Sequence, residues 1–325
     1  MTYSTVEELL KSINPDFIED VQISTAEGFV KEGLSNRTIS ELVMAGLIVN
    51  YGQTTAAHKF VGSVSSATGD GNLWSIVGGN KLLPEKLLKY SGATLINAKV
   101  EKIKWDEQYE QYLVSYYVDR FAHRENKPDR NITLTDKNLV TKVYDIVIVA
   151  APLTRDTSNI VFEKLPSLTF VPDGRYHRTV CTIVKGKLNH RYFGERNEAN
   201  EIYSIKDNLL INSVARIYSV HKRPRKGESE VWKVFSQKPL SKDDLSEMFL
   251  RLIDVKVVDW LAYPHYDSNQ TLGSFVLAKN LYHVNAIEWA ASAMEMSVIG
   301  AKNVALLAYK NWRGVNVDNS EKDEL

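Results

Sequence analysis

Apolar residues in the first part of the chain recur at the spacing of helices. Thr5 followed by Glu8 is typical of a capping box at a helix start. The apolar residues that recur at helical spacing are Val6, Leu9, Leu10, Ile39, Leu42, Val43 and Leu47. The pattern predicts helices over residues 4–48 that pack through one apolar side.

The next part of the chain combines one short helix pattern with several strand patterns. Lys81–Tyr90 predicts a helix with Pro84 close to its start, where proline is tolerated. The runs that predict strands are Thr94–Lys104, Tyr112–Val118, Asn131–Val140 and Tyr144–Ala150. The last run is mainly apolar and stops at Ala151 and Pro152, which indicates a buried strand. We therefore expect a meander that leads into a buried strand.

A second strand-rich region follows, with a helix pattern and an aromatic group behind it. The predicted strands are His177–Lys187, Glu201–Val220 and Val231–Phe235, and the predicted helix is Lys242–Leu252. We expect these strands to build a sheet that the helices before residue 48 partly cover. The aromatic group consists of Trp260, Tyr263, His265 and Tyr266. Such a group forms either a structural cluster or the wall of a dry ligand slot.

The last apolar segment, Leu281–Ile287, predicts a strand that ends at one acidic residue, Glu288. Small residues follow, and then a helix whose apolar positions go nearly all round predicts a buried helix. The N–H groups at the start of that helix favour electron-rich ligand atoms, and Glu288 could hold a sugar-like hydroxyl beside them. The alternative is a buried C-terminal helix with a surface glutamate.

Six segments in the same order along the chain resemble the prenylcysteine oxidase family, also called prenylcysteine lyases. They are VNYGQTT (Val49–Thr55), FVGSVSS (Phe60–Ser66), NLWSIVGGNKLL (Asn72–Leu83), YDIVIVAAPL (Tyr144–Leu153), WLAYPHY (Trp260–Tyr266) and the run from Leu281 to Gly314. The last of these is also similar, more loosely, to the flavin-binding segment of flavin amine oxidases. Because the segments span almost the whole chain, the resemblance is more specific than any single motif.

The resemblance implies an FAD-dependent thioether oxidase for the degradation of prenylated proteins. Its substrates are farnesyl- or geranylgeranyl-cysteine, O2 and water, and its products are cysteine, an isoprenoid aldehyde and hydrogen peroxide. Since the cofactor carries the hard chemistry, no catalytic dyad is expected. Two alternatives remain: a non-catalytic truncated relative or fragment that cannot bind FAD by itself, and an amine oxidase.

The resemblance also implies a set of site residues. Implied FAD contacts are Val100, Ala151, Pro152, Glu288, Met294 and Met296. The catalytic candidates on the substrate side are Trp260, Tyr263 and His265. Two positions depart from the family pattern, since Ala286 stands where glycine is expected and Trp289 replaces a smaller residue. If the Trp289 ring points into the protein core, the cofactor site is unaffected.

The implied fold is mixed α/β, of the glutathione-reductase or amine-oxidase type, with a substrate domain of helices and a sheet. The chain contains no G-x-G-x-x-G turn, and Met1 corresponds to an internal position of the family. We therefore expect the later two thirds of a longer enzyme, without its N-terminal βαβ unit. The expected division is 1–80, helical part of the substrate domain; 81–165, meander and buried strand; 166–275, substrate-domain sheet; 276–314, FAD-binding strand and helix; and 315–325, a tail.

Composition is that of an ordinary globular protein, with 325 residues, 44% apolar, 25% charged and zero net charge. Nothing in it indicates a nucleic-acid partner, and the basic cluster at 221–227 is expected to be a solvated loop. No apolar run is long enough to span a bilayer. We expect no metal, and Cys181 is expected to be a buried core residue.

Compartment signals point to the lumen of the secretory pathway. The chain ends in Lys322-Asp323-Glu324-Leu325, a signal that the KDEL receptor of the endoplasmic reticulum reads. Glycosylation sequons occur at Asn36, Asn131 and Asn269. We expect an endoplasmic-reticulum or lysosomal protein whose signal peptide lies in the segment missing from this chain.

Overall fold

The computed structural model describes residues 1–67, 74–118, 138–165, 174–195, 197–206, 208–218 and 229–314. The chain divides into two compact units. Unit 1 consists of Met1–Ile13, Leu88–Asp173 and Thr271–Leu325, and unit 2 consists of Asn14–Leu87 and Gly174–Gln270. Each unit thus combines segments from distant parts of the sequence, and both contain helices and strands, which confirms the mixed α/β class.

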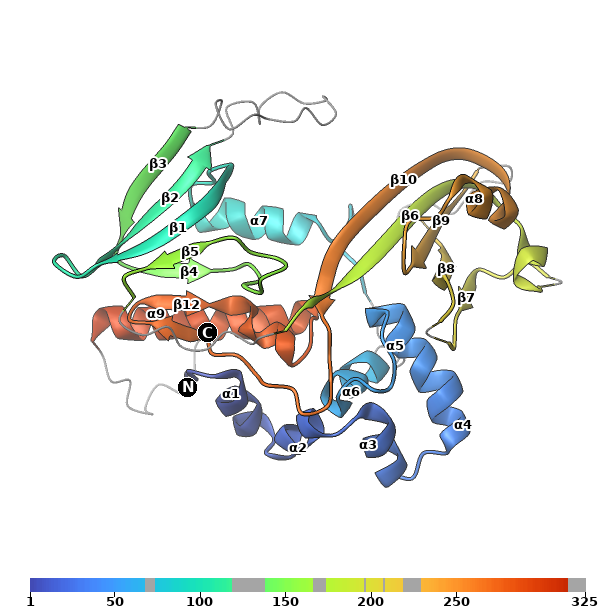
Figure 1. Ribbon diagram of the computed structural model, residues 1–325, viewed down its shortest axis with the longest axis horizontal. Helices are drawn as coiled ribbons and strands as arrows, with labels where there is room; N and C mark the ends of the chain where they lie inside the picture. The colour runs from blue at the N-terminus through green and yellow to red at the C-terminus, as the bar shows by residue number, and fades with distance from the viewer. Residues whose placement is uncertain are drawn as a thin grey trace. The chain divides into compact units, whose positions relative to one another are not determined.

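Unit 2 is built on an antiparallel sheet whose described strands lie in the order β10–β6–β9–β8–β7 (Figure 1). The strands are β6 (Tyr176–Leu188), β7 (Glu201–Tyr203), β8 (Ile211–Arg216), β9 (Glu230–Ser236) and β10 (Phe249–Pro264). A 3-10 turn, His190–Phe193, follows β6. The predicted strands at His177–Lys187 and Val231–Phe235 are confirmed, and Cys181 is buried within β6 as expected.

Helix α8 (Lys242–Met248) packs at the end of this sheet, where the chain turns into β10. Ser241 caps it, since the Ser241 hydroxyl accepts from the N–H of Asp244 at 3.0 Å and the Asp244 carboxylate accepts from the N–H of Ser241 at 2.8 Å. The buried residues that form the core here are Val184, Leu188, Val214, Trp232, Val234, Leu245, Met248 and Phe249. Burial of this much apolar surface is the main stabilising contribution in the region.

The remaining helices of unit 2 confirm the helical pattern of the first part of the chain. They are α2 (Asp16–Gln22), α3 (Thr25–Lys31), α4 (Asn36–Thr38), a π-helical turn at Ile39–Val43, α5 (Met44–Tyr51) and α6 (Lys59–Ala67). Helix α5 contacts β7 and β8. Part of the predicted helical region therefore lies on the sheet, as expected.

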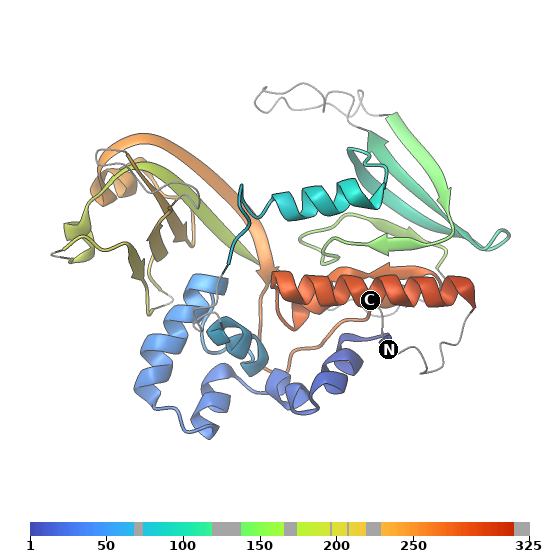
Figure 2. The same cartoon turned by 180° about the vertical axis from the view of Figure 1, so that it is seen from behind.

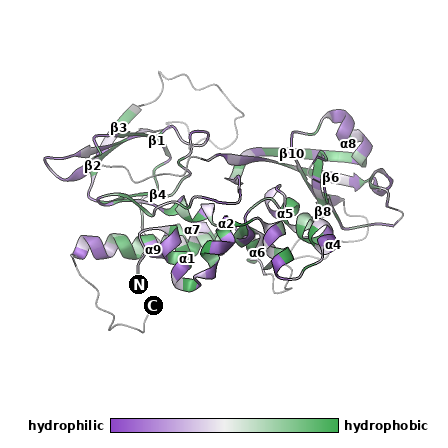
Figure 3. Cartoon of the chain, turned by 60° about the horizontal axis from the view of Figure 1, so that its bottom comes forward, coloured by the Kyte–Doolittle hydropathy of each residue, from purple (hydrophilic) through white to green (hydrophobic). Residues whose placement is uncertain are grey.

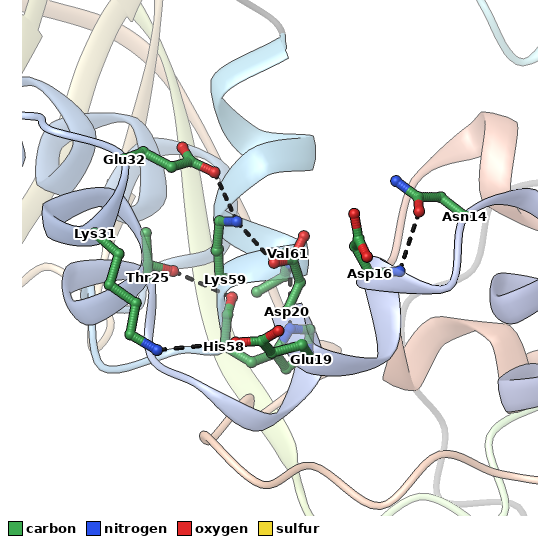
Figure 4. Close-up of polar contacts among 10 residues, drawn as sticks. All are labelled: Asn14, Asp16, Glu19, Asp20, Thr25, Lys31, Glu32, His58, Lys59 and Val61. Atoms are coloured by element: carbon green, nitrogen blue, oxygen red, sulfur yellow. Dashed lines mark hydrogen bonds and ion pairs between the residues drawn. The ribbon is translucent and has the colours of Figure 1, made fainter.

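One buried ion-pair network links three of these helices (Figure 4). The Lys59 ammonium of α6 lies 2.7 Å from an Asp20 carboxylate oxygen of α2 and 2.6 Å from a Glu32 oxygen at the end of α3. The side chains of Lys59 and Asp20 are 14% and 15% exposed. Because a charge with little solvent around it needs a partner, this network fixes how α2, α3 and α6 meet.

Unit 1 contains two described sheets and the helices that flank them. One sheet has the order β3–β2–β1–β5 and the other β11–β12–β4. The strands are β1 (Ala98–Asp106), β2 (Gln111–Val118), β3 (Asn138–Tyr144), β4 (Val147–Val149), β5 (Val161–Glu163), β11 (Val276–Ala278) and β12 (Leu281–His283). The helices are α1 (Val6–Ile13), α7 (Leu82–Ser91, which begins in unit 2) and α9 (Met294–Arg313). Figure 2 shows α9 alongside the strands of unit 1.

The predicted meander is confirmed, because β1 pairs antiparallel with β2 and β2 with β3. The core residues that these strands share with the second sheet are Ile103, Trp105, Tyr112, Val114, Tyr116, Val149, Leu277 and Leu281. Helix α1 begins as predicted, since the Glu8 N–H donates to Thr5 Oγ1 at 3.1 Å and the Thr5 N–H to a Glu8 carboxylate oxygen at 3.2 Å. The capping box is therefore real.

Several predicted boundaries in unit 1 are wrong. The strand expected at Leu281–Ile287 ends at His283, and a 3-10 helix, Val284–Trp289, follows. The strand expected at Tyr144–Ala150 is only Val147–Val149, and Ile148 is exposed rather than buried. Short apolar runs fit a strand and a helical turn equally well, so periodicity alone cannot place these ends. Of the strand expected at Asn131–Val140, residues 131–137 lie outside the described residues.

Helix α9 is not fully buried, contrary to its nearly all-round apolar pattern. One face is buried through Gly300, Asn303, Val304, Leu307 and Ala308. The exposed large apolar residues of the helix are Met294, Val298, Ile299, Tyr309 and Trp312. Hydrophobic and hydrophilic colours accordingly both appear along α9 in Figure 3. The second apolar face has no covering partner among the residues that the structure describes.

In unit 2 the main error concerns β10. The helix expected at Lys242–Leu252 stops at Met248, because Phe249 is extended and opens β10. The run of β-branched residues that follows favours a strand. The region expected as one strand over Glu201–Val220 contains two, β7 and β8, and its last two residues lie outside the described part. No helix among the described residues has both the length and the apolar character to cross a membrane.

Candidate functional site

Two of the predicted cofactor segments meet where a pair of parallel strands ends. Strands β4 and β12 pair in parallel, with Val149 opposite His283. Ala151 and Pro152 follow β4, and the segment that contains Glu288 follows β12. His283 Nε2 lies 3.2 Å from the carbonyl oxygen of Ala151. In open α/β sheets, ligands bind outside the carboxyl ends of such strands, so this edge is the first candidate site.

The segment after β12 is tightly packed up to its glutamate. Ala286, Ile287 and Trp289 are buried, whereas Glu288 is half-buried. Trp289 is only 2% exposed, so protein encloses its side chain. The bulky residue that departs from the family pattern therefore belongs to the core.

Helix α9 begins a few residues later and is 20 residues long. Its N-cap residue is Ala293, which makes no side-chain capping hydrogen bond. The first N–H groups of a helix have no partner within the helix, and here no cap side chain takes one. Met294, the first residue of the helix, is 57% exposed, and Met296 is half-buried. The helix start can thus be approached from solvent.

A cavity of about 510 Å³ lies beside β4 in the same unit. The residues that line it are Thr94, Leu95, Ile96, Ala98, Val100, Ile103, Val114, Tyr116, Tyr144, Ile146, Val147, Ile148, Val149, Ala150, Ala151 and Ile160. Its volume lies in the range of small-molecule sites, and its lining is mainly apolar. The cavity brings together two predicted cofactor contacts, Val100 and Ala151. It does not include Pro152, Glu288, Met294 or Met296.

A second candidate site lies in unit 2, where aromatic rings gather around Tyr263. The Tyr51 ring meets the Tyr263 ring at 5.2 Å and the Tyr266 ring at 5.5 Å, both edge to face. The His177 ring stacks on Tyr263 at 6.0 Å and on His265 at 6.3 Å. Such aromatic pairs are favourable beyond their buried area, so these contacts hold the cluster together.

Gln53 holds the chain of this aromatic cluster in place. Its buried amide donates to the Pro264 carbonyl at 2.9 Å and accepts from the Tyr266 N–H at 2.8 Å. Burial, the neighbouring His265 and Arg175 lower the pKa of His177 to about 4. His177 is consequently neutral near pH 7, so its ring adds no positive charge to the cluster.

The sequence prediction found only part of these two sites. Tyr263 and His265 come together in the aromatic cluster, whereas Trp260 lies on β10 with an exposed side chain. The prediction missed His177, which stacks between them, and His283, which links β12 to Ala151. A histidine inside an apolar strand run was the available signal for both.

Comparison with known proteins places the chain in a family. The family model described as prenylcysteine lyase matches residues 1–322. Prenylcysteine oxidase 1 of Mus musculus is 34% identical over 333 residues, which cover 99% of this chain and 64% of the relative. Prenylcysteine oxidase 1 of Homo sapiens is 35% identical over 338 residues, with coverages of 99% and 64%.

A third relative, prenylcysteine oxidase 1-like of Mus musculus, is 35% identical over 328 residues, or 95% of this chain and 62% of the relative. The chain belongs to the prenylcysteine lyase family. It spans a little under two thirds of the length of these curated relatives.

Proposed function

We propose that this chain is part of a flavin-dependent oxidase that cleaves the thioether of prenylcysteines. The observation that carries the proposal is the family match over residues 1–322, with relatives named prenylcysteine oxidase. The overall reaction converts farnesyl- or geranylgeranyl-cysteine, O2 and water into cysteine, an isoprenoid aldehyde and hydrogen peroxide. Degradation of prenylated proteins is the process that this reaction serves.

The residues that follow the carboxyl ends of β4 and β12 suit FAD. Strand ends, an exposed helix start and an apolar cavity are the features that hold dinucleotides in sheets of the glutathione-reductase or amine-oxidase type. The residues that would hold the cofactor are Val100, Ala151, Pro152, Glu288, Met294 and Met296. Bound FAD would supply the acceptor for hydride from the carbon next to the sulfur.

All of these residues except Pro152 have a distinct task in the proposal. Val100 and Ala151, both at the wall of the cavity, would face the adenosine half. Glu288, a half-buried residue in the 3-10 turn after β12, would accept a hydrogen bond from a hydroxyl of the cofactor. Met294 and Met296, in the first turn of α9, would contact the flavin half of the cofactor.

Unit 2 would bind the isoprenoid part of the substrate. Tyr263 and His265 belong to the aromatic cluster that Gln53 holds in place. His177, in the same cluster, is neutral near pH 7 and adds no positive charge there. A dry aromatic wall orients an apolar chain and excludes water from the reacting carbon. Trp260, Tyr263 and His265 are the residues proposed to contact the substrate.

A second candidate is a relative or fragment that keeps the pocket but cannot hold FAD by itself. The exposed apolar face of α9 favours it, because a large uncovered apolar surface is typical of a region that another segment covers. Both candidates would reside in the secretory pathway lumen, in the endoplasmic reticulum or a lysosome. Asn36 and Asn269 are exposed, as glycan acceptors must be, whereas Asn131 and the KDEL tail that its receptor would read lie outside the described residues.

The test is FAD retention by the purified chain. The chain is incubated with excess FAD, free cofactor is removed, and the visible absorbance spectrum is recorded. A retained flavin spectrum, followed by hydrogen peroxide release from farnesylcysteine but not from free cysteine, supports the oxidase. A folded, colourless protein supports the second candidate instead.

A further inference from the structure

Strand β10 presents a long, partly apolar edge to solvent. It is 16 residues long and stands at the end of its sheet, where β6 is its only neighbour among the described strands. Figure 1 shows β10 running along β6 over its whole length. The exposed large apolar residues of β10 are Leu250, Leu252, Ile253, Val255, Val257, Val258, Trp260 and Leu261. An edge strand with β-branched side chains is a template for another strand, although the Val255 N–H of this edge already donates to Asp254 Oδ1 at 3.0 Å.

The charges on β10 are arranged with opposite signs about Val255. Asp254 precedes Val255 by one residue, and Lys256 follows it by one. Arg251 precedes Val255 by four residues, and Asp259 follows it by four. Each charge therefore has a charge of the opposite sign at the same distance on the other side.

We propose that this chain forms a homodimer in which β10 pairs antiparallel with β10 of a second copy, with the two-fold axis at Val255. In that register Asp254 lies opposite Lys256 of the second copy, and Arg251 comes near its Asp259, since the bulge between Leu252 and Asp254 shifts the direct pairing by one residue. The apolar residues Leu250, Leu252 and Ile253 then lie along the apolar residues Val257 and Val258 of the second copy. Opposite charges and apolar side chains directly across an antiparallel pair are both favourable.

Neighbouring registers lack this match. A shift that moves the axis to Asp254 places two aspartates opposite each other, and a shift to Lys256 does the same with two lysines. The two nearest registers centred between residues, on either side of Val255, place each of the four charges opposite an apolar residue. The pattern thus specifies one register and disfavours the alternatives, which is how strand pairing becomes selective.

The central charges are not held in ion pairs within the described part of the chain, although Asp254 Oδ1 already accepts a hydrogen bond from the Val255 N–H at 3.0 Å. No ion pair among the described residues involves Arg251, Asp254 or Lys256. Asp259 is already paired with Arg178 of β6, at 2.6 and 2.9 Å. Arg251 of the second copy would share that carboxylate. The pairing between Asp254 and Lys256 is therefore the new electrostatic contact, and the two-fold axis makes it occur twice.

The irregularities of β10 confine regular pairing to the centre of this register. Its pairing with β6 is regular from Asp254 to Leu261, and bulges lie between Phe249 and Arg251 and between Leu252 and Asp254. A two-fold axis at Val255 places the bulges of the two copies symmetrically at either side of the central pairs. The bend that each bulge introduces then lies outside the central pairs that Asp254, Val255 and Lys256 form between the two copies.

Charge reversal tests the proposal by sedimentation velocity over a range of protein concentrations. The wild-type chain is expected to approach twice the chain mass as concentration rises. Asp254→Lys alone and Lys256→Asp alone each replace two attractive pairs by two repulsive ones, so dimer affinity falls about tenfold or more. The double variant Asp254→Lys/Lys256→Asp restores both pairs and is expected to dimerise like the wild type.

Mixing the two single variants separates this effect from misfolding. A 1:1 mixture of Asp254→Lys and Lys256→Asp chains regains complementary charges and is expected to form a heterodimer, although each variant alone stays monomeric. Lys242→Asp, on α8, is the control with the same charge change away from the edge, and it is expected to dimerise normally. A monomeric wild type, or a double variant that fails to recover, overturns the proposal.

Cysteine cross-linking tests the register. Only a residue on the two-fold axis lies opposite its own copy, so Val255→Cys is expected to form an intermolecular disulfide under mild oxidation. Val258→Cys is the matched control, since Val255 and Val258 are similarly exposed, at 37% and 40%, and Val258 lies three positions away from the axis. The native Cys181 is buried and is not expected to compete. Equal cross-linking at both positions, or none at 255, contradicts the proposed axis.

Discussion

His283 Nε2 lies 3.2 Å from the carbonyl oxygen of Ala151, across 132 positions of the sequence. Burial lowers the pKa of His283 to about 4, although the Ala151 carbonyl acts in the opposite direction. The ring is therefore neutral near pH 7, and a proton on Nε2 lets it donate to Ala151. This contact joins the chain after β4 to the last residue of β12, next to the two segments that the proposed cofactor site needs together.

The first prediction is an acid-sensitive fold. Above pH 6.5, His283 is neutral in both the folded and the unfolded chain, so it adds no pH dependence. As the pH falls towards 4, the unfolded chain binds the proton first, and the free energy of unfolding decreases by up to roughly 3 kcal/mol from this residue. His177, whose pKa is also lowered to about 4, acts in the same window and direction.

Urea unfolding at pH 7 and pH 5 checks this prediction. The loss of stability between the two values is expected to be about 2 kcal/mol smaller in His283→Gln than in the wild type, because the variant has no imidazole to protonate. The same comparison between pH 7 and pH 8 should show no difference. If His283→Gln loses as much stability as the wild type, the wild-type His283 ring is already protonated or exposed.

The second prediction concerns Gly52, which ends α5 with φ +62°. A Cβ at this position would lie 2.6 Å from His177 Nε2 and 3.2 Å from Asn212 Nδ2. Gly52→Ala is therefore expected to cost about 2 kcal/mol or more, since backbone strain adds to a clash. It should also disturb the stack of His177 on Tyr263.

Gly33→Ala is the matched control, because Gly33 also has a positive φ but has open space where its Cβ would stand. Only the backbone cost, about 1 kcal/mol, applies there. Urea titrations of both variants give the comparison. Equal losses would mean that the His177 ring moves aside freely and that the cluster is not rigid.

Local pattern was sufficient for the features that depend on neighbours in sequence. The Thr5–Glu8 capping box and the strands around Tyr112–Val118 and His177–Lys187 are examples. Patterns failed where the same residues suit two structures. Phe249, Leu250 and Leu252 continue the helical spacing of α8, yet they open β10, because pairing with β6 outweighs local preference.

The candidate sites depend on contacts that are distant in sequence, so the residues alone could indicate only their parts. Val100 and Ala151 line one cavity because β1 and β4 belong to the same unit, and no spacing rule expresses that. Gln53 reaches Pro264 across 211 positions. His177 was missed because a histidine in an apolar strand looks like any core residue until its neighbours Tyr263 and His265 are known.

The third prediction concerns the buried ion pairs of Lys59. Lys59→Met leaves Asp20 with little solvent and no cation, which should lower the free energy of unfolding by about 3 kcal/mol. Lys31→Met removes a cation from the same region, where Lys31 lies 3.9 Å from Glu19 and both side chains are well exposed (Figure 4). That variant should change stability by less than about 0.5 kcal/mol. Urea unfolding of the two variants shows whether the loss of stability depends on the burial of the ion pair or only on the distance between its charges.

The fourth prediction tests the proposed role of Glu288 in holding FAD. Glu288→Gln keeps the size of the side chain but replaces a charged hydrogen-bond acceptor by a neutral one. Hydrogen bonds to charged groups contribute about 1.5–3 kcal/mol, so FAD affinity is expected to fall about tenfold or more. A titration that follows flavin fluorescence measures the affinity directly and needs no turnover.

Glu295→Gln is the matched control, because Glu295 is an exposed acid in the first turn of α9 only seven positions further on. If the carboxylate of Glu288 accepts a cofactor hydroxyl, Glu295→Gln should leave the affinity within about twofold of the wild type, since an exposed charge at a helix end has only a small effect. Equal losses in both variants would instead assign the effect to the general charge near the helix start. Unchanged binding in Glu288→Gln would remove this residue from the proposed site, while Val100 and Ala151 at the cavity wall would remain to be tested in the same titration.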